Sequence, residues 1–483
     1  MSQFVAFTLV TFQMGIDSAI YFLLLAVVAV LHALLPGRRR VFLLLGASLA
    51  FYAATSLPYL LLMAVLGMTN YFAARHLSSD SNPKSRQWVF AGAVLVNLCI
   101  LAAFKYLRGQ LGHLLAGFDH GALDSDGVAH LAAPLGISYF VFAMIGCITD
   151  AYRQTWRLQG GIANFLLFGL FFPQISSGPI PRADRLLPQL ITSATPTAED
   201  RIAGLRMIAY GLFKKYVVAN RLNEYVNLVF ASPGEATPSQ AAVACAFNFI
   251  QLYADFSGYV DIAIGSARLL GIHLDPNFDR PFKSTSVTEL WRRWHMTLSF
   301  WLRDYVYMPM LIRIRTLGKF GVALALVVTF ALCGLWHGAA WTYILFGVSQ
   351  GIAMSMEFLS KSWRSKAFRG IPPAIVAMAG NIYTIVFFAV TEVIFRSSDL
   401  AQAGTMYRAL FHWNLTTLLA YPPLDHYFLA LDLFALFCWW VVRRWFVATS
   451  TKTYWTPWFT MACAGLILFF GHLGAAHFIY ATF

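Results

Sequence analysis

Long apolar runs recur from one end of this sequence to the other, and they constrain its fold more than any other feature. Runs near 18–36, 88–104, 317–336 and 375–395 approach the roughly 20 apolar residues that cross a bilayer as a helix. Only 12% of the 483 residues are charged, whereas a soluble domain carries about 25%. The alternation typical of strands is absent from the sequence, so we expect an all-α polytopic membrane protein rather than a barrel.

Some of the other apolar runs are short for a span. By the length rule for spanning helices we predict about eleven transmembrane helices, with re-entrant and interfacial helices beside them. No repeat or linker divides the chain, so residues 1–483 are predicted to form a single integral membrane domain. The N-terminus lacks a basic region before its first apolar run, and we expect it to be retained rather than cleaved. These further runs fall near 41–56, 57–73, 131–151, 161–176, 203–220, 239–270, 340–358, 426–442 and 455–474.

The formal net charge of +13 does not indicate a nucleic-acid partner. The basic residues cluster at the ends of apolar runs, as they do in cytoplasmic loops under the positive-inside rule, and no soluble domain with a basic face is visible. Counting crossings from these loops places the loops 105–130 and 396–425 on the outer side. The loops predicted to be cytoplasmic contain Gly37–Arg40, then Arg75, Lys84 and Arg86, then Lys361–Arg369, and finally Arg443 and Arg444.

The cysteines do not have the spacing of a metal site, and the proline-rich stretch cannot form a simple spanning helix. No CxxC pair or Cys/His spacing occurs, so we predict no metal site and expect the cysteines to be small core residues. The stretch Phe171–Leu190 contains several prolines and is predicted to be irregular backbone, which is tolerated at membrane depth only inside protein or beside a water-filled cavity. The six cysteines are Cys99, Cys147, Cys245, Cys333, Cys438 and Cys463.

A histidine lies at the joint between two apolar runs, in the sequence GLWHGAAW (Gly334–Trp341). The basic residues before 317–336 place its start in the cytoplasm, so His337 is predicted near the outer end of a helical hairpin. A neutral imidazole can take a proton from an alcohol that attacks a carbonyl. Gly334 and Gly338 could permit close approach of backbone or of a substrate, and Trp336 and Trp341 could enclose an acyl group. An interhelical hydrogen bond is the alternative for His337.

A second histidine lies in ELWRRWHMTLSFWLRDYVYMP (Glu289–Pro309). Its tryptophans and Leu298 recur at helical spacing, which predicts an amphipathic helix that lies at the membrane or dips into it from the cytoplasmic side. His295 and Ser299 are one turn apart on this helix. Structural anchoring remains the alternative for His295 and for the tryptophans. His32, His273, His412 and His472 are interpreted as structural.

Two acidic residues, Asp255 and Asp261, lie within apolar sequence. Intramembrane carboxylates are functional candidates, and the alternative is a charge paired with Arg268 or another basic residue. If His295 and His337 converge from opposite sides, they could serve a transfer reaction with a cytoplasmic donor and an external acceptor. A transporter or channel lined by these groups is the alternative from another class, although the sequence shows no repeated pair of broken helices.

At these residues the chain resembles the membrane-bound O-acyltransferases, and most closely the bacterial alginate O-acetylation type. The resemblance covers nearly the whole chain, and the two histidine motifs in this order make it specific. The matching stretches are PQISSGPIPR (Pro173–Arg182), YADFSGYVDIAIGSARLLGI (Tyr253–Ile272), the His295 motif and GLWHGAAWTYILFGVSQG (Gly334–Gly351).

The resemblance implies a many-helix membrane fold around a central acyl-transfer site in the bacterial inner membrane. It implies His337 as the catalytic base and His295 as the second active-site histidine, which positions or polarises the donor. No cofactor is bound; the implied co-substrate is an acyl thioester, acetyl-coenzyme A. The implied partners are the lipid bilayer, the acyl donor and a periplasmic or extracellular acceptor or transferase protein. The supporting site candidates are Trp336, Gly338, Trp294, Ser299, Arg303, Asp304, Asp255 and Ser257.

Two departures bear on the substrate rather than on the histidines. The alginate type usually continues after DYVYMP with a Gly-Gly-Asn-Arg turn, and this chain has MLIRIRTLGK (Met310–Lys319) instead. Ala254 stands where a bulky aromatic residue is usual. A related branch that transfers D-alanine from a carrier protein to teichoic acid also lacks the turn. The resemblance therefore implies O-acetylation of a cell-envelope or exopolysaccharide acceptor, with D-alanyl transfer as the alternative.

Overall fold

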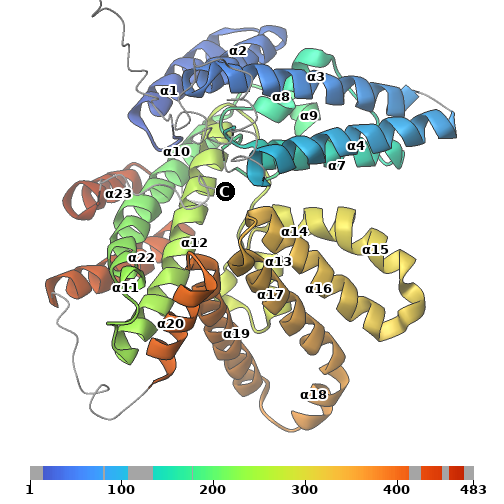
Figure 1. Ribbon diagram of the computed structural model, residues 1–483. Helices are drawn as coiled ribbons and strands as arrows, with labels where there is room; N and C mark the ends of the chain where they lie inside the picture. Colours follow the sequence, from blue (N-terminus) through green and yellow to red (C-terminus); the bar gives the residue numbers. More distant parts are fainter. Residues whose placement is uncertain are drawn as a thin grey trace, which may run out of the picture. The chain divides into compact units, whose positions relative to one another are not determined.

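The computed structural model describes residues 15–79, 82–106, 134–176, 178–412, 426–448 and 456–472, and these residues form helices and no strand (Figure 1). The predicted outer loop 105–130 lies almost entirely outside the described residues, as does much of the loop 396–425. The chain divides into two compact units. The first comprises Met1–Gly204 with Ser266–Leu274, and the second comprises Leu205–Gly265 with Asp275–Phe483.

The first unit is built from helices that follow the N-terminal apolar runs. Between α8 and α9 the chain turns irregularly, as the prolines predict, and Phe171, Phe172 and Gln174 are buried there. The prediction is wrong for residues 183–190, which belong to helix α9 with Pro188 inside it. The Phe172 amide donates to the Ser48 hydroxyl at 3.1 Å, so protein surrounds this irregular backbone. The helices are α1 (Ala19–Leu34), α2 (Gly37–Thr55), α3 (Leu57–Ser79), α4 (Pro83–Tyr106), α7 (Ile137–Tyr152), α8 (Ile162–Leu170), α9 (Ala183–Thr192) and the start of α10 (Ala198–Phe213).

The second unit contains both histidine motifs. Its first part runs through η1 (Lys214–Ala219), α11 (Asn220–Ala231), α12 (Pro238–Leu269) and η2 (Pro281–Lys283). The motif helices follow: α13 (Val287–Arg293), α14 (Met296–Leu302), η3 (Arg303–Tyr307), α15 (Met308–Arg313), η4 (Arg315–Leu317), α16 (Gly318–His337) and α17 (Trp341–Leu359). The last part comprises α18 (Lys361–Ala367), α19 (Pro373–Arg396), α20 (Leu400–Phe411), α22 (His426–Ala448) and α23 (Thr456–Phe470).

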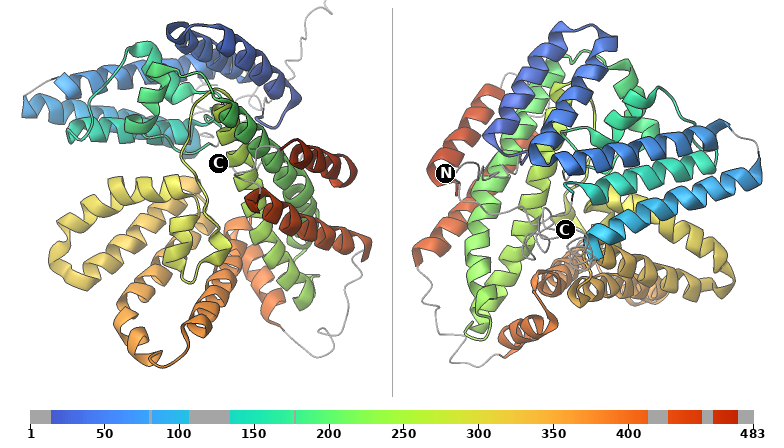
Figure 2. Two further views of the ribbon diagram at one scale, coloured as in Figure 1. Left: turned by 180° about the vertical axis from the view of Figure 1, so that it is seen from behind. Right: turned by 45° about the horizontal axis from the view of Figure 1, so that its top comes forward.

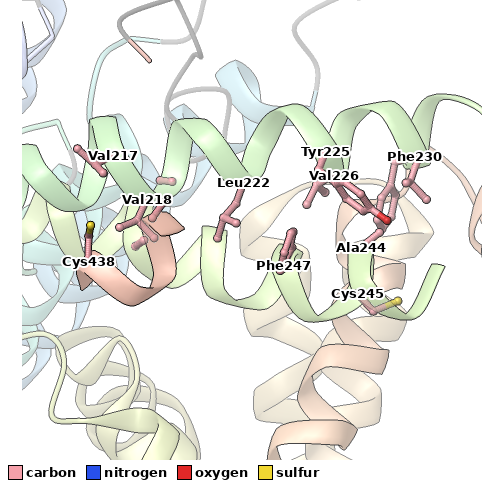
Figure 3. Packing of buried hydrophobic residues seen from close by; sticks show 14 of the residues in the cluster. Val217, Val218, Leu222, Tyr225, Val226, Phe230, Ala244, Cys245, Phe247 and Cys438 are labelled. Atoms are coloured by element: carbon pink, nitrogen blue, oxygen red, sulfur yellow. The ribbon is translucent and has the colours of Figure 1, made fainter. Parts of the chain in front are cut away.

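The core of this unit forms where η1 and α11 face α12. Figure 3 shows Leu222 and Val226 directed toward the helix that carries Ala244 and Phe247, with Cys438 of α22 closing one end. These side chains are apolar and buried, so their removal from water stabilises the helix pair. The core therefore fixes α12, the helix that also carries Asp255, Phe256 and Ser257.

Four of the described helices are long and apolar enough to cross a membrane: Leu57–Ser79, Pro83–Tyr106, Arg315–His337 and Pro373–Arg396. Shorter apolar helices are Ala19–Leu34, Ile137–Tyr152 and Thr456–Phe470. The described residues thus form a polytopic helical protein, and the count of about eleven crossings remains a prediction.

The hairpin of α16 and α17 is the tightest helix pair in the second unit, and Figure 1 and Figure 2 show its two helices side by side. A Cβ atom on Gly334 would lie 2.2 Å from the carbonyl oxygen of Tyr343, and one on Gly347 would lie 2.1 Å from that of Phe330. Both obstacles are backbone atoms, so only glycine lets the two helices approach this closely. The predicted hairpin is confirmed, and Gly334 permits the close approach of backbone that was one of its two predicted roles.

The cysteine prediction is wrong at one position. All six cysteines are free thiols and five are buried, but Cys99 is exposed. It lies on α4, whose apolar surface is mostly exposed, so an apolar side chain there need not be part of the core.

Candidate active site

His337 is the last residue of α16 and is buried. Its imidazole lies 4.7 Å from the ring of Trp336 and 5.1 Å from the ring of Phe395, both edge-on. Phe395 belongs to α19, so three helices hold the ring: α16 carries it, α19 packs on it, and α17 fixes α16. The next residue, Gly338, is extended with φ of 177°. A Cβ atom there would lie 2.6 Å from the Tyr343 ring, so this glycine makes room for an aromatic ring at the helix end.

The predicted amphipathic helix 289–309 is broken at the second histidine. Helix α13 ends at Arg293 and α14 begins at Met296. His295 lies between them in the left-handed conformation, with φ of 43° and ψ of 53°. A single helix was therefore the wrong prediction, because helical spacing of apolar residues continues across a break of two residues. Non-glycine residues in this conformation are strained, and such strain is concentrated at functional sites.

Asn277, which precedes α13 in a loop, holds this break together. Its side-chain oxygen accepts from the Thr297 amide at 3.0 Å, from the Thr297 hydroxyl at 2.9 Å and from His295 Nδ1 at 3.2 Å. Its backbone carbonyl accepts from the Met296 amide at 2.9 Å. These bonds satisfy backbone groups at the start of α14 that have no partner within the helix. Nothing in the sequence pattern singled out Asn277.

The two histidines come together through one indole. The ring of Trp336 lies 6.2 Å from that of His295 and 4.7 Å from that of His337. Phe256 of α12 packs edge-on against His295 at 4.8 Å. Two motifs separated by about forty residues in sequence thus meet in one buried, mostly aromatic environment.

Asp255 and Ser257 flank Phe256 on α12 and bind two buried lysines of η1. Lys215 Nζ lies 2.6 Å from the Asp255 carboxylate, and Lys214 Nζ lies 2.8 Å from the Ser257 hydroxyl. Lys214 also pairs with Asp261 at 2.8 Å. The acidic residues are paired, as the structural alternative predicts, but with lysines. Arg268 instead pairs with Asp200 in the first unit.

The other supporting candidates contribute to the break or lie on its surface. Trp294 is buried against Phe249 and Phe388, and the Ser299 hydroxyl donates to the Trp294 carbonyl at 3.3 Å. Arg303 is more than half exposed and pairs with Asp304 at 2.7 Å. Trp341 is 67% exposed, so the expectation that it encloses an acyl group together with Trp336 is wrong.

Burial sets the protonation state of His295. The aromatic surroundings disfavour a charged ring and lower the pKa of His295 to about 3. The ring is therefore neutral near pH 7. Within the described ranges no group of three His, Cys, Asp or Glu residues could hold a metal ion.

The described residues form helices, four of them long and apolar enough to cross a membrane, and two buried histidines meet at one indole among them. These features define a membrane protein with a buried histidine site. Residues 157–398 match the model of MBOAT, the membrane-bound O-acyltransferase family. The chain belongs to this family and is an O-acyltransferase.

The relatives include three kinds of transferase. A probable alginate O-acetylase of Azotobacter vinelandii is 34% identical over 82% of this chain and 78% of that protein. A peptidoglycan O-acetyltransferase of Helicobacter pylori is 31% identical over 74% of this chain and 71% of that protein. A teichoic acid D-alanyltransferase of Bacillus subtilis is 30% identical over 49% of this chain and 62% of that protein.

Proposed function

We propose that this protein moves an acetyl group from cytoplasmic acetyl-coenzyme A to a hydroxyl group of a cell-envelope or exopolysaccharide acceptor on the outer side of the bacterial inner membrane. The observation that carries the proposal is the meeting of His295 and His337 at the Trp336 indole. Relatives named for acetylation of alginate and of peptidoglycan match the greater part of the chain and support this acceptor class.

His337 is proposed as the general base. As the acceptor oxygen attacks the thioester carbonyl, the proton of its hydroxyl passes to the imidazole, and the carbon–sulfur bond then breaks. The same proton is returned to the departing thiolate, so the ring ends neutral.

His295 is proposed to act on the donor side, because its motif precedes the basic stretch predicted to be cytoplasmic. The multi-pass arrangement with about eleven crossings belongs to the same proposal, as does a periplasmic or extracellular partner that receives the acetyl group. Supporting roles are proposed for Trp336 and Phe395, which fix the ring of His337.

D-alanyl transfer from a carrier protein is the second candidate. The teichoic acid D-alanyltransferase relative supports it, and so does the stretch MLIRIRTLGK in place of the Gly-Gly-Asn-Arg turn. Both reactions use a thioester and a hydroxyl, so the two histidines serve either one.

The test uses membranes that contain the protein, supplied with radiolabelled acetyl-coenzyme A or with D-alanyl carrier protein. We expect label from acetyl-coenzyme A to enter envelope polymer or a partner protein, and His337→Ala to abolish the transfer. Label from the carrier alone would establish the second candidate. Normal transfer by a well-expressed, correctly inserted His337→Ala protein would overturn the role of the base.

A further inference from the structure

The break at His295 contains one side-chain oxygen that serves three donors, and this arrangement determines where the hydrogen of the imidazole lies. The Thr297 amide can only donate, so the atom that faces it at 3.0 Å must be the oxygen of the Asn277 amide rather than its nitrogen. A flipped amide would direct two N–H groups at each other. The orientation of Asn277 is therefore fixed by the backbone.

His295 Nδ1 lies 3.2 Å from this same oxygen. An amide oxygen accepts and cannot donate, so Nδ1 carries the hydrogen in this bond. In a neutral imidazole the other nitrogen then carries the lone pair. Ring orientation set by a second partner is how proteins select one histidine tautomer.

We infer that Asn277 is a positioning residue that holds the hydrogen of His295 on Nδ1 and so makes Nε2 a proton acceptor. The inference rests on the proposed function in one respect, which is that both histidines serve one site. It changes the role implied for His295. A lone pair on Nε2 cannot polarise a thioester carbonyl, which requires a hydrogen donor. It can receive an O–H or N–H group of a substrate, or a proton.

Charged groups near the break are mostly paired with one another. Asp255 is paired with Lys215, and the ring contacts of His295 include Phe256 and Trp336. Other titratable groups on the elements packed here include His337, Asp275, Arg292, the Lys214–Asp261 pair, and the ion pairs of Asp279 with Arg280 and Arg293, of Glu289 with Arg293, and of Arg303 with Asp304. Helices α17 and α19, which pack on α13, add Glu357, Glu392 and Arg396.

The first experiment is Asn277→Asp. A carboxylate oxygen keeps the acceptor for Thr297 and His295 but adds a negative charge beside the ring, which favours the protonated form. We expect the acid limb of the pH profile of kcat/KM to move upward by about one to three pH units, the effect of an opposite charge at this distance. A purely structural role would lower the rate at every pH and leave the limb in place, and that result would overturn the inference.

Asn248→Asp is the matched control. Asn248 is buried on α12, and its side-chain oxygen accepts from Arg396 at 3.4 Å, so the same change adds a carboxylate beside a guanidinium. We expect its acid limb to stay at the wild-type pH. An equal shift in both variants would show a general charge effect and would contradict a specific role for Asn277.

The second experiment uses the wild-type protein, so its outcome does not depend on whether a variant of Asn277 folds. The protein is labelled with 15N in its histidine rings and solubilised in detergent, and the His295 resonances are assigned as those lost in His295→Gln. We expect a protonated Nδ1 and an unprotonated Nε2 at pH 7. The opposite tautomer would overturn the inference even if acetyl transfer is confirmed. If the expected tautomer is found but the protein transfers no acetyl group, the proposed function is wrong and the inference about Asn277 stands.

Discussion

The two histidines of the site are held in different ways. His295 lies in a strained left-handed turn. Asn277 accepts hydrogen bonds from the His295 ring and from the backbone amides of Met296 and Thr297. His337 lies at the end of a regular helix, packed between the rings of Trp336 and Phe395. Hydrogen bonding to a ring nitrogen selects a tautomer.

The difference suits two different tasks. A general base must gain and lose a proton in each cycle, and rigid placement serves it provided that either protonation state can be accommodated. A residue that only receives a hydrogen from a substrate works best with one fixed tautomer. The rings of Trp336 and Phe395 give His337 the fixed place that the first task needs, and the bond from His295 to Asn277 fits the second.

The largest expected effect is the loss of either ring. We expect His295→Ala and His337→Ala each to lower acyl transfer by about 10²–10⁴-fold, the usual contribution of a positioned acid or base. The effects of substituting residues that act as a unit are strongly non-additive. The double variant should therefore be no more than a few-fold slower than the less active of the two single variants. Transfer is measured in membranes and normalised to the amount of inserted protein. Multiplied effects in the double variant would contradict a shared step.

The next effect separates the helix packing that positions His337 from the Asn277 bond that positions His295. In Gly334→Ala the added Cβ meets the Tyr343 carbonyl oxygen, so α16 must move away from α17 and carry His337 with it. Misplacement of a catalytic group by about 1 Å can cost about 10²-fold in rate, and we expect a loss of that size while the 15N spectrum still shows His295 protonated on Nδ1.

Gly404→Ala on α20 is the control, because no atom lies within 4 Å of a Cβ built there. It should retain wild-type transfer. A Gly334→Ala protein as active as this control would show that the hairpin does not position His337.

The sequence predicted the parts of this arrangement that repeat with a regular period. Apolar runs predicted the helices, and the basic residues before 317–336 predicted the hairpin whose turn follows His337. The break at His295 could not be predicted in this way, because Trp291, Trp294 and Leu298 keep helical spacing on both sides of it. Apolar periodicity reports which side chains are buried and does not report φ at one residue.

The partners of the charged residues also depended on the fold. Asp255 and Asp261 are paired as expected of charges in an apolar run, yet Lys214 and Lys215 lie about forty residues away in sequence and only the packing of η1 on α12 brings them there. Asn277 and Phe395 were missed for the same reason. A single asparagine in a proline-containing loop and a phenylalanine in an apolar helix carry no pattern that distinguishes them.

A smaller effect tests the indole between the rings. Trp336→Phe keeps a ring beside His337 but shortens its reach toward His295, which lies 6.2 Å away at the ring centre. An aromatic pair is worth about 0.5–1.5 kcal/mol, which corresponds to about a 2- to 13-fold change in rate. We expect a loss of that size in transfer, with no change in thermal stability beyond a few degrees. A loss as large as that of His337→Ala would instead indicate that the indole contacts the reacting groups directly.

The smallest effect compares the two backbones. At His295 the left-handed conformation favours glycine over alanine, so His295→Gly should be more stable than His295→Ala by about 1 kcal/mol. At His337 the backbone is helical and the order reverses, so His337→Gly should be less stable than His337→Ala by about 0.5–1 kcal/mol. The melting temperatures of the four variants in detergent measure this reversal in the order of the Gly and Ala variants. All four proteins lack a ring, so catalysis does not enter the comparison. Parallel rather than crossed differences would show that His295 is not held in a left-handed turn.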